Sequence, residues 1–376
     1  MWTLYLISVI PVAVFAVLWV HSRRIVWWEF LLSVAISVAV ASAVCLATVK
    51  LQTLDHETWS GRVVTARYTP KWIEECRETD NDGRTTTTHK THYPEWVVYA
   101  TFGVADISRN ISEAKYMDLL RKFGKYYSTI GNRPGFYEGD RNDYWLSNIW
   151  GYFEPIQIRK HFKNMFKASQ NVMSFIKVPE GVNVFPYPEN RNLFVSNRLL
   201  GVASCTVDIL EWDRLNSRLW PRKEVNLILI GFKKGTEPEM GKYQESAWLG
   251  GKKNDVVLCY CLKDKKHVDW SYVFGWTEKA IVKKNLETML LINVPSNKIL
   301  PLIENEIRKY YVPKDWDKFN YLTIYPSLNT YIVLIVILAI AQILYGSFVL
   351  RNDTDKGGRD ERRYLEKLKE TEKIQK

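Results

Sequence analysis

The sequence lacks the short motifs by which several common enzyme classes are recognised. It contains no Gly-x-Ser-x-Gly nucleophile turn, no phosphate-binding loop and no His-Glu-x-x-His zinc motif. Each of these motifs places a nucleophile, a phosphate cradle or a pair of metal ligands in the geometry that its reaction requires. Their absence excludes hydrolases, nucleotide-binding enzymes and zinc proteases of those particular types.

Cysteines are few, and their positions do not form a framework. Cys45 falls in an apolar segment, while Cys259 and Cys261 alternate on a predicted strand and share one face, where they are poorly placed to bond to each other. Cys76 and Cys205 remain as a conceivable pair. No Cys-x-x-Cys spacing is present, so the sequence predicts buried or free thiols and no zinc centre.

Charged side chains are absent from three long stretches, Met1–Val20, Phe30–Val49 and Phe319–Leu350. A membrane helix needs about 20 apolar residues to cross about 30 Å of hydrocarbon. Elsewhere in the chain charges recur every few residues. The sequence therefore predicts three transmembrane helices, arranged as a helical hairpin over residues 1–50 and a single helix over residues 326–350.

Basic residues beside these segments predict the orientation. Arg23 and Arg24 lie in the short connector of the hairpin, and residues 351–376 form a charged tail with nine Lys or Arg. Short basic loops stay on the cytoplasmic side, whereas long domains cross the membrane largely regardless of charge. We therefore expect a protein of the cytoplasmic (inner) membrane of a bacterium, with the tail in the cytoplasm and residues 51–328 on the extracytoplasmic side.

The formal net charge is +11, but Lys and Arg are interspersed with acidic residues along the globular part. Such mixing is typical of a solvated surface, whereas nucleic-acid sites concentrate basic residues in patches. The partners that the sequence predicts are therefore membrane lipid and other protein chains, with no nucleic acid.

Residues 51–197 have the pattern of a β-rich subdomain with one long polar hairpin. Alternating strands are predicted from Thr58 to Phe102, a helix over Ser112–Phe123, and no assignable fold over residues 124–192. A polar hairpin is a common device for gripping a neighbouring subunit, and a mobile loop on a monomer is the alternative. Its turn and Thr-rich strand supply the candidate interaction residues, which are Asp80, Asn81, Asp82, Gly83, Thr85, Thr86, Thr87 and Thr88.

Residues 198–325 alternate between helical and strand patterns, which predicts an α/β sandwich with helices on a mixed sheet. The expected strands are Val225–Phe232, Asp255–Leu262 and Val268–Phe274, and the expected helices are Val207–Leu219 (ending before Pro221), Pro238–Trp248, Glu278–Leu291 and Asn297–Tyr311. The whole chain is thus expected to be an α+β membrane protein.

Part of this region resembles a known family. The strand Val225–Ile230, the Trp/Gly-rich loop within Ala247–Leu258 and the run Trp270–Trp276 resemble the TPM domain over about residues 198–325. The resemblance implies an extracytoplasmic domain tethered to a membrane, in a family described as metal-binding that includes acid phosphatases, assembly factors and auxiliary subunits. The Trp59–Gly61 strand and the Thr-rich hairpin are also similar to uncharacterised membrane proteins of tailed phages, which implies a role at a host envelope.

A phosphatase of this family would require acidic residues at strand ends to hold Ca²⁺ or Mg²⁺. Asp255 and Asp269 are the candidate metal ligands, with Asp264 between them. Several neighbouring lysines oppose cation binding, and Trp276 replaces a glycine of the family pattern. Asp255 has a plainer reading as a turn residue before a strand.

Three functions remain open, in this order. The first is a non-enzymatic membrane scaffold, a homo-oligomer without a cofactor whose exposed domain binds an unidentified protein. The second is a metal-dependent phosphatase of the TPM type. The third is an oligomeric pore, which the last span supports only weakly, because Gln342 is its one strongly polar residue.

Overall fold

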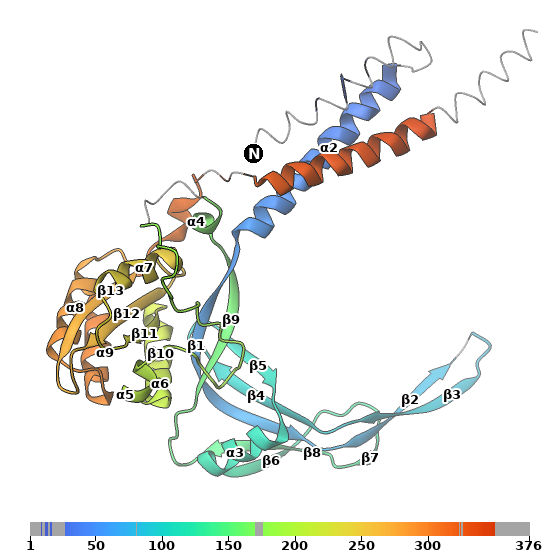
Figure 1. Cartoon of the computed structure of the whole chain (residues 1–376). Helices are drawn as coiled ribbons and strands as arrows, with labels where there is room; N and C mark the ends of the chain where they lie inside the picture. The colour runs from blue at the N-terminus through green and yellow to red at the C-terminus, as the bar shows by residue number, and fades with distance from the viewer. Residues whose placement is uncertain are drawn as a thin grey trace, which may run out of the picture. The chain divides into compact units, whose positions relative to one another are not determined.

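The computed structural model describes Val9, Val12, Ala13, Ala16 and residues 27–349, except for 80, 170–175, 323 and 325. These residues belong to two compact units (Figure 1). The membrane-type unit falls within residues 1–55, 163–174 and 317–376, and the globular unit comprises 56–162 and 175–316. Most of the predicted first span, the basic connector and the whole charged tail lie outside the described residues.

Two helices of the membrane-type unit are long and apolar enough to cross a membrane, Phe30–Thr53 within α2 (Trp27–Thr53) and Leu328–Val349. They coincide with the second and third segments predicted from the sequence. Their buried contact consists of small and aliphatic side chains, namely Ala41, Cys45, Leu334 and Leu338.

A polar contact also joins these two helices. Ser33 Oγ donates a hydrogen bond to Gln342 Oε1 at 2.9 Å, and Gln342 Nε2 donates to Ser37 Oγ at 2.8 Å. Ser33 and Ser37 are fully buried and lie four residues apart, on one face of α2. Interhelical hydrogen bonds of this kind stabilise helix pairs in apolar surroundings.

The same unit includes a short segment, residues 164–168, beside the end of α2. Asn164 donates from its backbone to the Thr53 carbonyl at 2.7 Å and from its side chain to Asp55 at 2.9 Å. Helix α4 (Met165–Ala168) follows, and Met165 packs with Leu322 and Ile324 in a small apolar cluster beyond η2 (Trp316–Phe319).

The first half of the globular unit is a six-stranded sheet covered by α3 (Glu113–Phe123). Its order is β5-β4-β1-β8-β6, with β9 also paired to β1. Ser112 caps α3 as predicted, by accepting a hydrogen bond from the Lys115 backbone. The strands are β1 (Leu54–Thr69), β4 (Glu95–Thr101), β5 (Asp106–Asn110), β6 (Gly124–Ile130), β8 (Asn142–Asn148) and β9 (Pro155–Lys163).

The second half is the predicted mixed sheet between helices. Its order is β10-β11-β12-β13, with the first two pairs parallel and the last antiparallel. One face packs against α6, α8 and α9 and the other against α7 and the segment around Phe185. The elements are β10 (Leu199–Gly201), α5 (Ala203–Thr206), α6 (Ile209–Lys223), β11 (Asn226–Phe232), α7 (Glu239–Ala247), β12 (Asp255–Leu262), β13 (Val268–Gly275), α8 (Ile281–Ile292), η1 (Asn297–Ile299) and α9 (Leu300–Tyr310).

Helix α6 does not stop before Pro221, so that prediction was wrong. The helix continues to Lys223 and ends where Glu224 adopts a left-handed conformation (φ 48°) and donates its backbone N–H to the Trp220 carbonyl. A proline in the last turn removes only one helical hydrogen bond, which the packing of Leu219 and Trp220 on either side of the helix outweighs.

A buried ion pair connects the two halves of the globular unit. Arg198 is 1% exposed, and its Nη1 lies 3.1 Å from Asp213 Oδ1 on α6, while its Nη2 donates to Ser60 Oγ on β1 at 2.6 Å. Burial raises the pKa of Asp213, although hydrogen bonds from Arg198 and Ser196 favour its charged form. Trp59 and Trp220 pack beside this pair, with ring centroids 5.6 Å apart.

Replacing Arg198 with Met would leave the Asp213 carboxylate buried without its counter-charge. We expect the free energy of unfolding of the full chain in detergent to fall by about 3–5 kcal/mol. The double variant Arg198→Met/Asp213→Leu should regain most of this loss, because both charges are then replaced by apolar groups. Urea denaturation followed by tryptophan fluorescence measures both, and a stable single variant would contradict this role.

Candidate functional site

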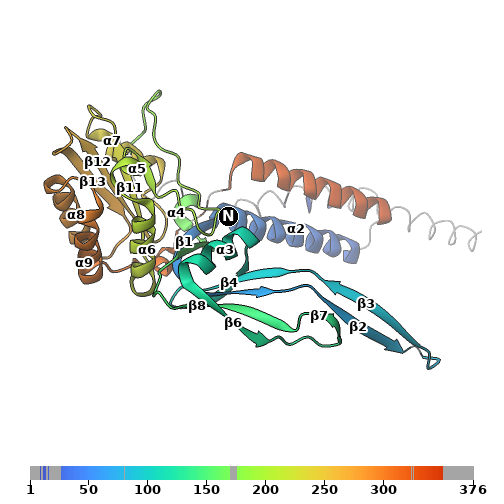
Figure 2. The same ribbon diagram turned by 90° about the horizontal axis from the view of Figure 1, so that it is seen from below.

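Strands β2 (Trp72–Thr79) and β3 (Thr85–His92) form a long antiparallel ribbon, here called the hairpin arm. They pair in unbroken register from Trp72 opposite His92 to Thr79 opposite Thr85. The third strand, β7 (Phe136–Gly139), pairs with residues 72–74 of β2, and the Glu75 backbone donates to the Gly135 carbonyl just before β7 at 2.7 Å. The outer part of the arm therefore has two strands only, and Figures 1 and 2 both show it extending beyond the strands of the six-stranded sheet.

The base of the arm is well packed. The ring of Trp72 stacks on His92 with centroids 4.1 Å apart, and the Arg133 guanidinium lies over the Trp72 ring, 5.6 Å from its centroid. His92 Nε2 lies 2.7 Å from Glu74 Oε2, and this hydrogen bond lowers the pKa of Glu74. The base thus fixes where the arm begins.

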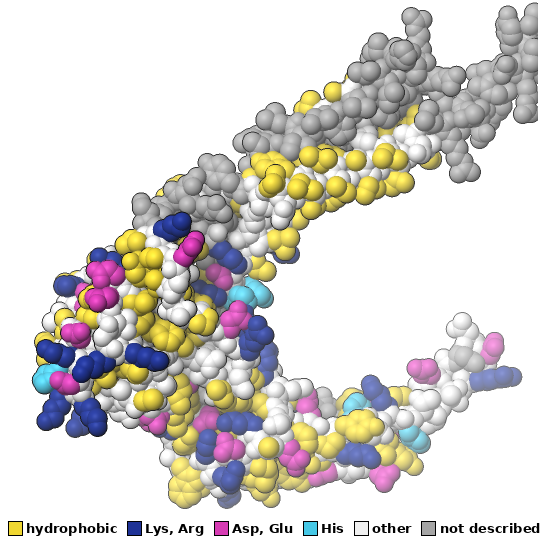
Figure 3. All heavy atoms as spheres, viewed as in Figure 1, with side chains coloured by type: hydrophobic (Ala, Val, Ile, Leu, Met, Phe, Trp, Pro, Cys, Tyr) yellow, Lys and Arg dark blue, Asp and Glu magenta, His cyan; other side chains and the backbone are white. Residues whose placement is uncertain are grey.

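The outer part of the arm is polar and exposed on both faces. All of Thr85–Thr88 are exposed, and Thr79 Oγ1 lies 3.1 Å from Thr85 Oγ1 across the strands. Figure 3 shows charged, histidine and polar surface along the arm, with apolar atoms gathered toward its base. Strand β3 is an edge strand, which leaves one row of its backbone groups available for pairing.

The predicted interaction residues therefore lie together at one end of the globular unit. Asn81, Asp82 and Gly83 occupy the tip, and Gly83 has a positive φ of 77°, which the turn requires. Thr85, Thr86, Thr87 and Thr88 follow on β3, whereas Asp80 lies outside the described residues.

Asp255 is completely buried at the start of β12. Its carboxylate accepts hydrogen bonds from Tyr187 Oη at 2.9 Å, from Asn226 Nδ2 at 2.8 Å and from the Lys252 backbone at 2.8 Å. Burial raises its pKa, which these hydrogen bonds lower in part. This carboxylate connects three segments of the chain that are distant in sequence.

The structure does not bring Asp255 and Asp269 together. Strand β13 runs antiparallel to β12, with Val256 opposite Gly275 and Cys261 opposite Trp270, so the two aspartates lie at opposite ends of the strand pair. Asp269 is exposed, and Asp264 pairs with His267 at 2.9 Å. Among the described residues no cluster of three or more His, Cys, Asp or Glu could hold a metal ion.

The substitution Asp255→Asn replaces one acceptor oxygen by a donor that faces other donors. We expect the free energy of unfolding to fall by about 1–3 kcal/mol, and by less than about 0.5 kcal/mol for the exposed control Asp269→Asn. Adding Ca²⁺ or Mg²⁺ should leave all unfolding midpoints unchanged, and the protein should not hydrolyse an aryl phosphate. Metal-dependent stabilisation or turnover that Asp255→Asn abolishes would instead identify a metal centre.

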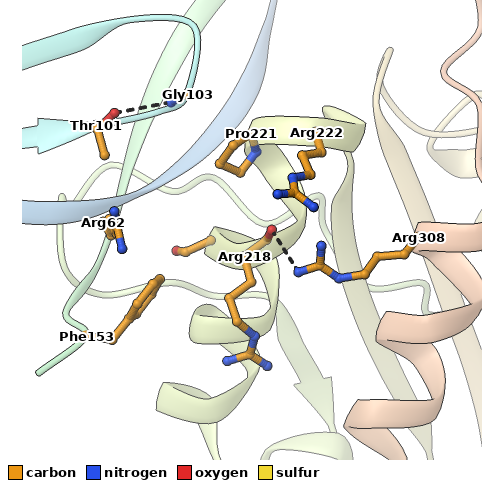
Figure 4. Close-up of a pocket in the computed structure, with 9 residues that line it drawn as sticks. Arg62, Thr101, Gly103, Phe153, Arg218, Pro221, Arg222 and Arg308 are labelled. Atoms are coloured by element: carbon orange, nitrogen blue, oxygen red, sulfur yellow. Dashed lines mark hydrogen bonds between the residues drawn. The ribbon is translucent and has the colours of Figure 1, made fainter. Parts of the chain in front are cut away.

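A cavity of about 480 Å³ lies between α6 and the six-stranded sheet, here called the arginine pocket (Figure 4). Figure 4 shows Arg62 and Phe153 on one side and Pro221 and Arg222 of α6 on the other. The lining consists of four arginines and five uncharged residues, namely Arg62, Arg218, Arg222, Arg308, Thr101, Gly103, Phe153, Ser217 and Pro221.

Glycine at position 103 allows the two sides of this pocket to approach. Gly103 has a φ of 86°, and a Cβ atom there would lie 2.6 Å from the Pro221 Cβ. A side chain would therefore strain the backbone and push α6 away.

The four arginines differ in their partners. Arg218 and Arg308 both bind Glu304, with shortest distances of 2.8 Å and 2.7 Å. Burial would raise the pKa of Glu304, but the hydrogen bonds from these two arginines hold it below its usual value. Arg62 and Arg222 are exposed at the pocket and form no ion pair within the described part of the chain.

Sequence reasoning missed the arginine pocket, because its residues come from β1, β4, α6 and α9 and from two loops. The one local signal is the spacing of Arg218 and Arg222, which places two arginines on one face of a helix. Comparisons of the chain with protein-family models, with curated proteins and with solved structures find no match.

Proposed function

We propose that this chain is a membrane-anchored, non-enzymatic interaction protein whose hairpin arm binds another protein chain, in the first place a second copy of itself. The observation that carries the proposal is the outer part of the arm, where two polar strands pair only with each other. An isolated two-stranded hairpin is marginally stable in water, so an added strand or a docked surface would stabilise it.

The chemistry of the arm suits a protein partner. Its β3 edge can extend a partner's sheet through backbone hydrogen bonds, and the Thr85–Thr88 hydroxyls can donate and accept beside them. Each face of the arm carries both signs of charge. Glu74 lies opposite Lys90 on one face, and Glu75 pairs with Arg77 on the other. This mixture favours a specific polar contact over a general attraction to polyanions.

The two apolar helices support membrane anchoring, with lipid as the surrounding partner. The positions of Arg23, Arg24 and the basic tail support an inner-membrane protein with the globular unit on the extracytoplasmic side. The TPM resemblance, its phosphatase alternative, the phage-type resemblance and the pore remain predictions, since no contact among the described residues favours one of them.

Shortening the arm tests its role in self-association. Replacing residues 77–87 with Asn-Gly closes the ribbon at the opposed pair Cys76 and Thr88 and keeps the contacts of Trp72 with His92. We expect the particle mass of the detergent-solubilised protein to fall toward that of one 44.0 kDa chain. Light scattering with detergent correction measures the mass.

The control for this experiment is Thr85→Ser/Thr87→Ser, which retains both hydroxyls and the length of the arm. Its particle mass should equal that of the wild-type protein. If the shortened variant also keeps the wild-type mass, the arm does not mediate self-association.

A reporter experiment tests the proposed orientation. A reporter enzyme that works only in the cytoplasm should be active when it is fused after Lys376. The same reporter inserted after Gly181, an exposed loop position with open space around it, should be inactive there, while a periplasmic reporter should be active. The reverse pattern would overturn the orientation.

A further inference from the structure

The arginine pocket has a positive charge that its own walls do not neutralise. Its lining includes four arginines and no acidic residue, and Glu304, outside the lining, is shared by Arg218 and Arg308. Four positive charges against one negative charge leave an excess of three. This excess of positive charge would attract an anion into the pocket.

Ser217 also lines the pocket, but its hydroxyl is not accessible from it. The residue is 4% exposed, and its Oγ is buried without a hydrogen-bond partner, as are Gln157 Oε1 and Trp220 Nε1. The charge of the arginines is therefore the feature of the pocket that points to a ligand.

The size and walls of the pocket limit the ligand. About 480 Å³ lies within the usual range for small-molecule sites, and it is more space than a lone phosphate ion fills. Phe153 and Pro221 supply apolar surface beside the charged groups. Guanidinium groups match phosphate oxygens with paired hydrogen bonds, and their charge persists at any physiological pH.

We propose that the arginine pocket binds a phosphate-bearing ligand, with Arg62 and Arg222 on the phosphate oxygens. Arg218 and Arg308 contribute charge while Glu304 holds them in place. The ligand is either a soluble phosphorylated small molecule or the headgroup of a phospholipid. The pocket and the hairpin arm involve different residues, so this proposal stands independently of the proposed function.

Titration of the full chain in phosphate-free detergent with inorganic pyrophosphate, at constant ionic strength, tests the proposal by calorimetry. We expect saturable binding that weakens about tenfold or more in Arg62→Gln and in Arg222→Gln. Arg109→Gln makes the same change in charge at an exposed position on β5 and should bind like the wild-type protein. The arm-shortened variant should also bind normally.

Repeating the titration in detergent doped with phosphatidic acid distinguishes the sources. Competition by the lipid identifies a headgroup site, and unchanged pyrophosphate affinity identifies a soluble ligand. Absence of saturable binding, or equal affinity in Arg222→Gln and Arg109→Gln, would overturn the proposal.

Discussion

The globular unit depends on the buried contact among Arg198, Asp213 and Ser60. Two opposite charges out of water attract strongly, but the cost of desolvating them is of similar size, so such a pair contributes little net stability. Its effect is to join α6 to β1, because one arginine side chain binds a residue of each. The arginine pocket lies along the same helix and the same strand, so its geometry follows from this contact.

Helix α6 has this central place because two sides of it are buried. Trp212, Leu215 and Leu219 pack on the β11–β12 sheet, while Trp220 packs with the other sheet. Asn216, fully buried, accepts a hydrogen bond from the Leu227 backbone at 2.7 Å and donates to its carbonyl at 3.3 Å. An amphipathic pattern assigns such polar positions to the solvent side, so the sequence predicts the helix but not its second contact.

Continuous apolar runs predicted β11 and β12 correctly, because such runs are typical of strands that are buried on both faces. Strand β6 was not predicted, since all seven of its residues are exposed and its position depends on pairing with β8. The sequence also could not distinguish Asp255 as a hydrogen-bond acceptor from Asp255 as a metal ligand. One of the donors to Asp255 is Tyr187, which lies 68 residues away in the sequence. The arginine pocket likewise consists of side chains from distant elements.

Polar groups in apolar surroundings are paired at each of the positions that organise this chain. Gln342 binds two serines of the neighbouring helix, Asp255 binds three donors, and Arg198 binds Asp213 and Ser60. The β3 edge of the hairpin arm departs from this pattern, because one row of its backbone groups has no strand beside it. The two proposed binding regions therefore differ in chemistry, since the arm offers backbone hydrogen bonds and the arginine pocket offers positive charge.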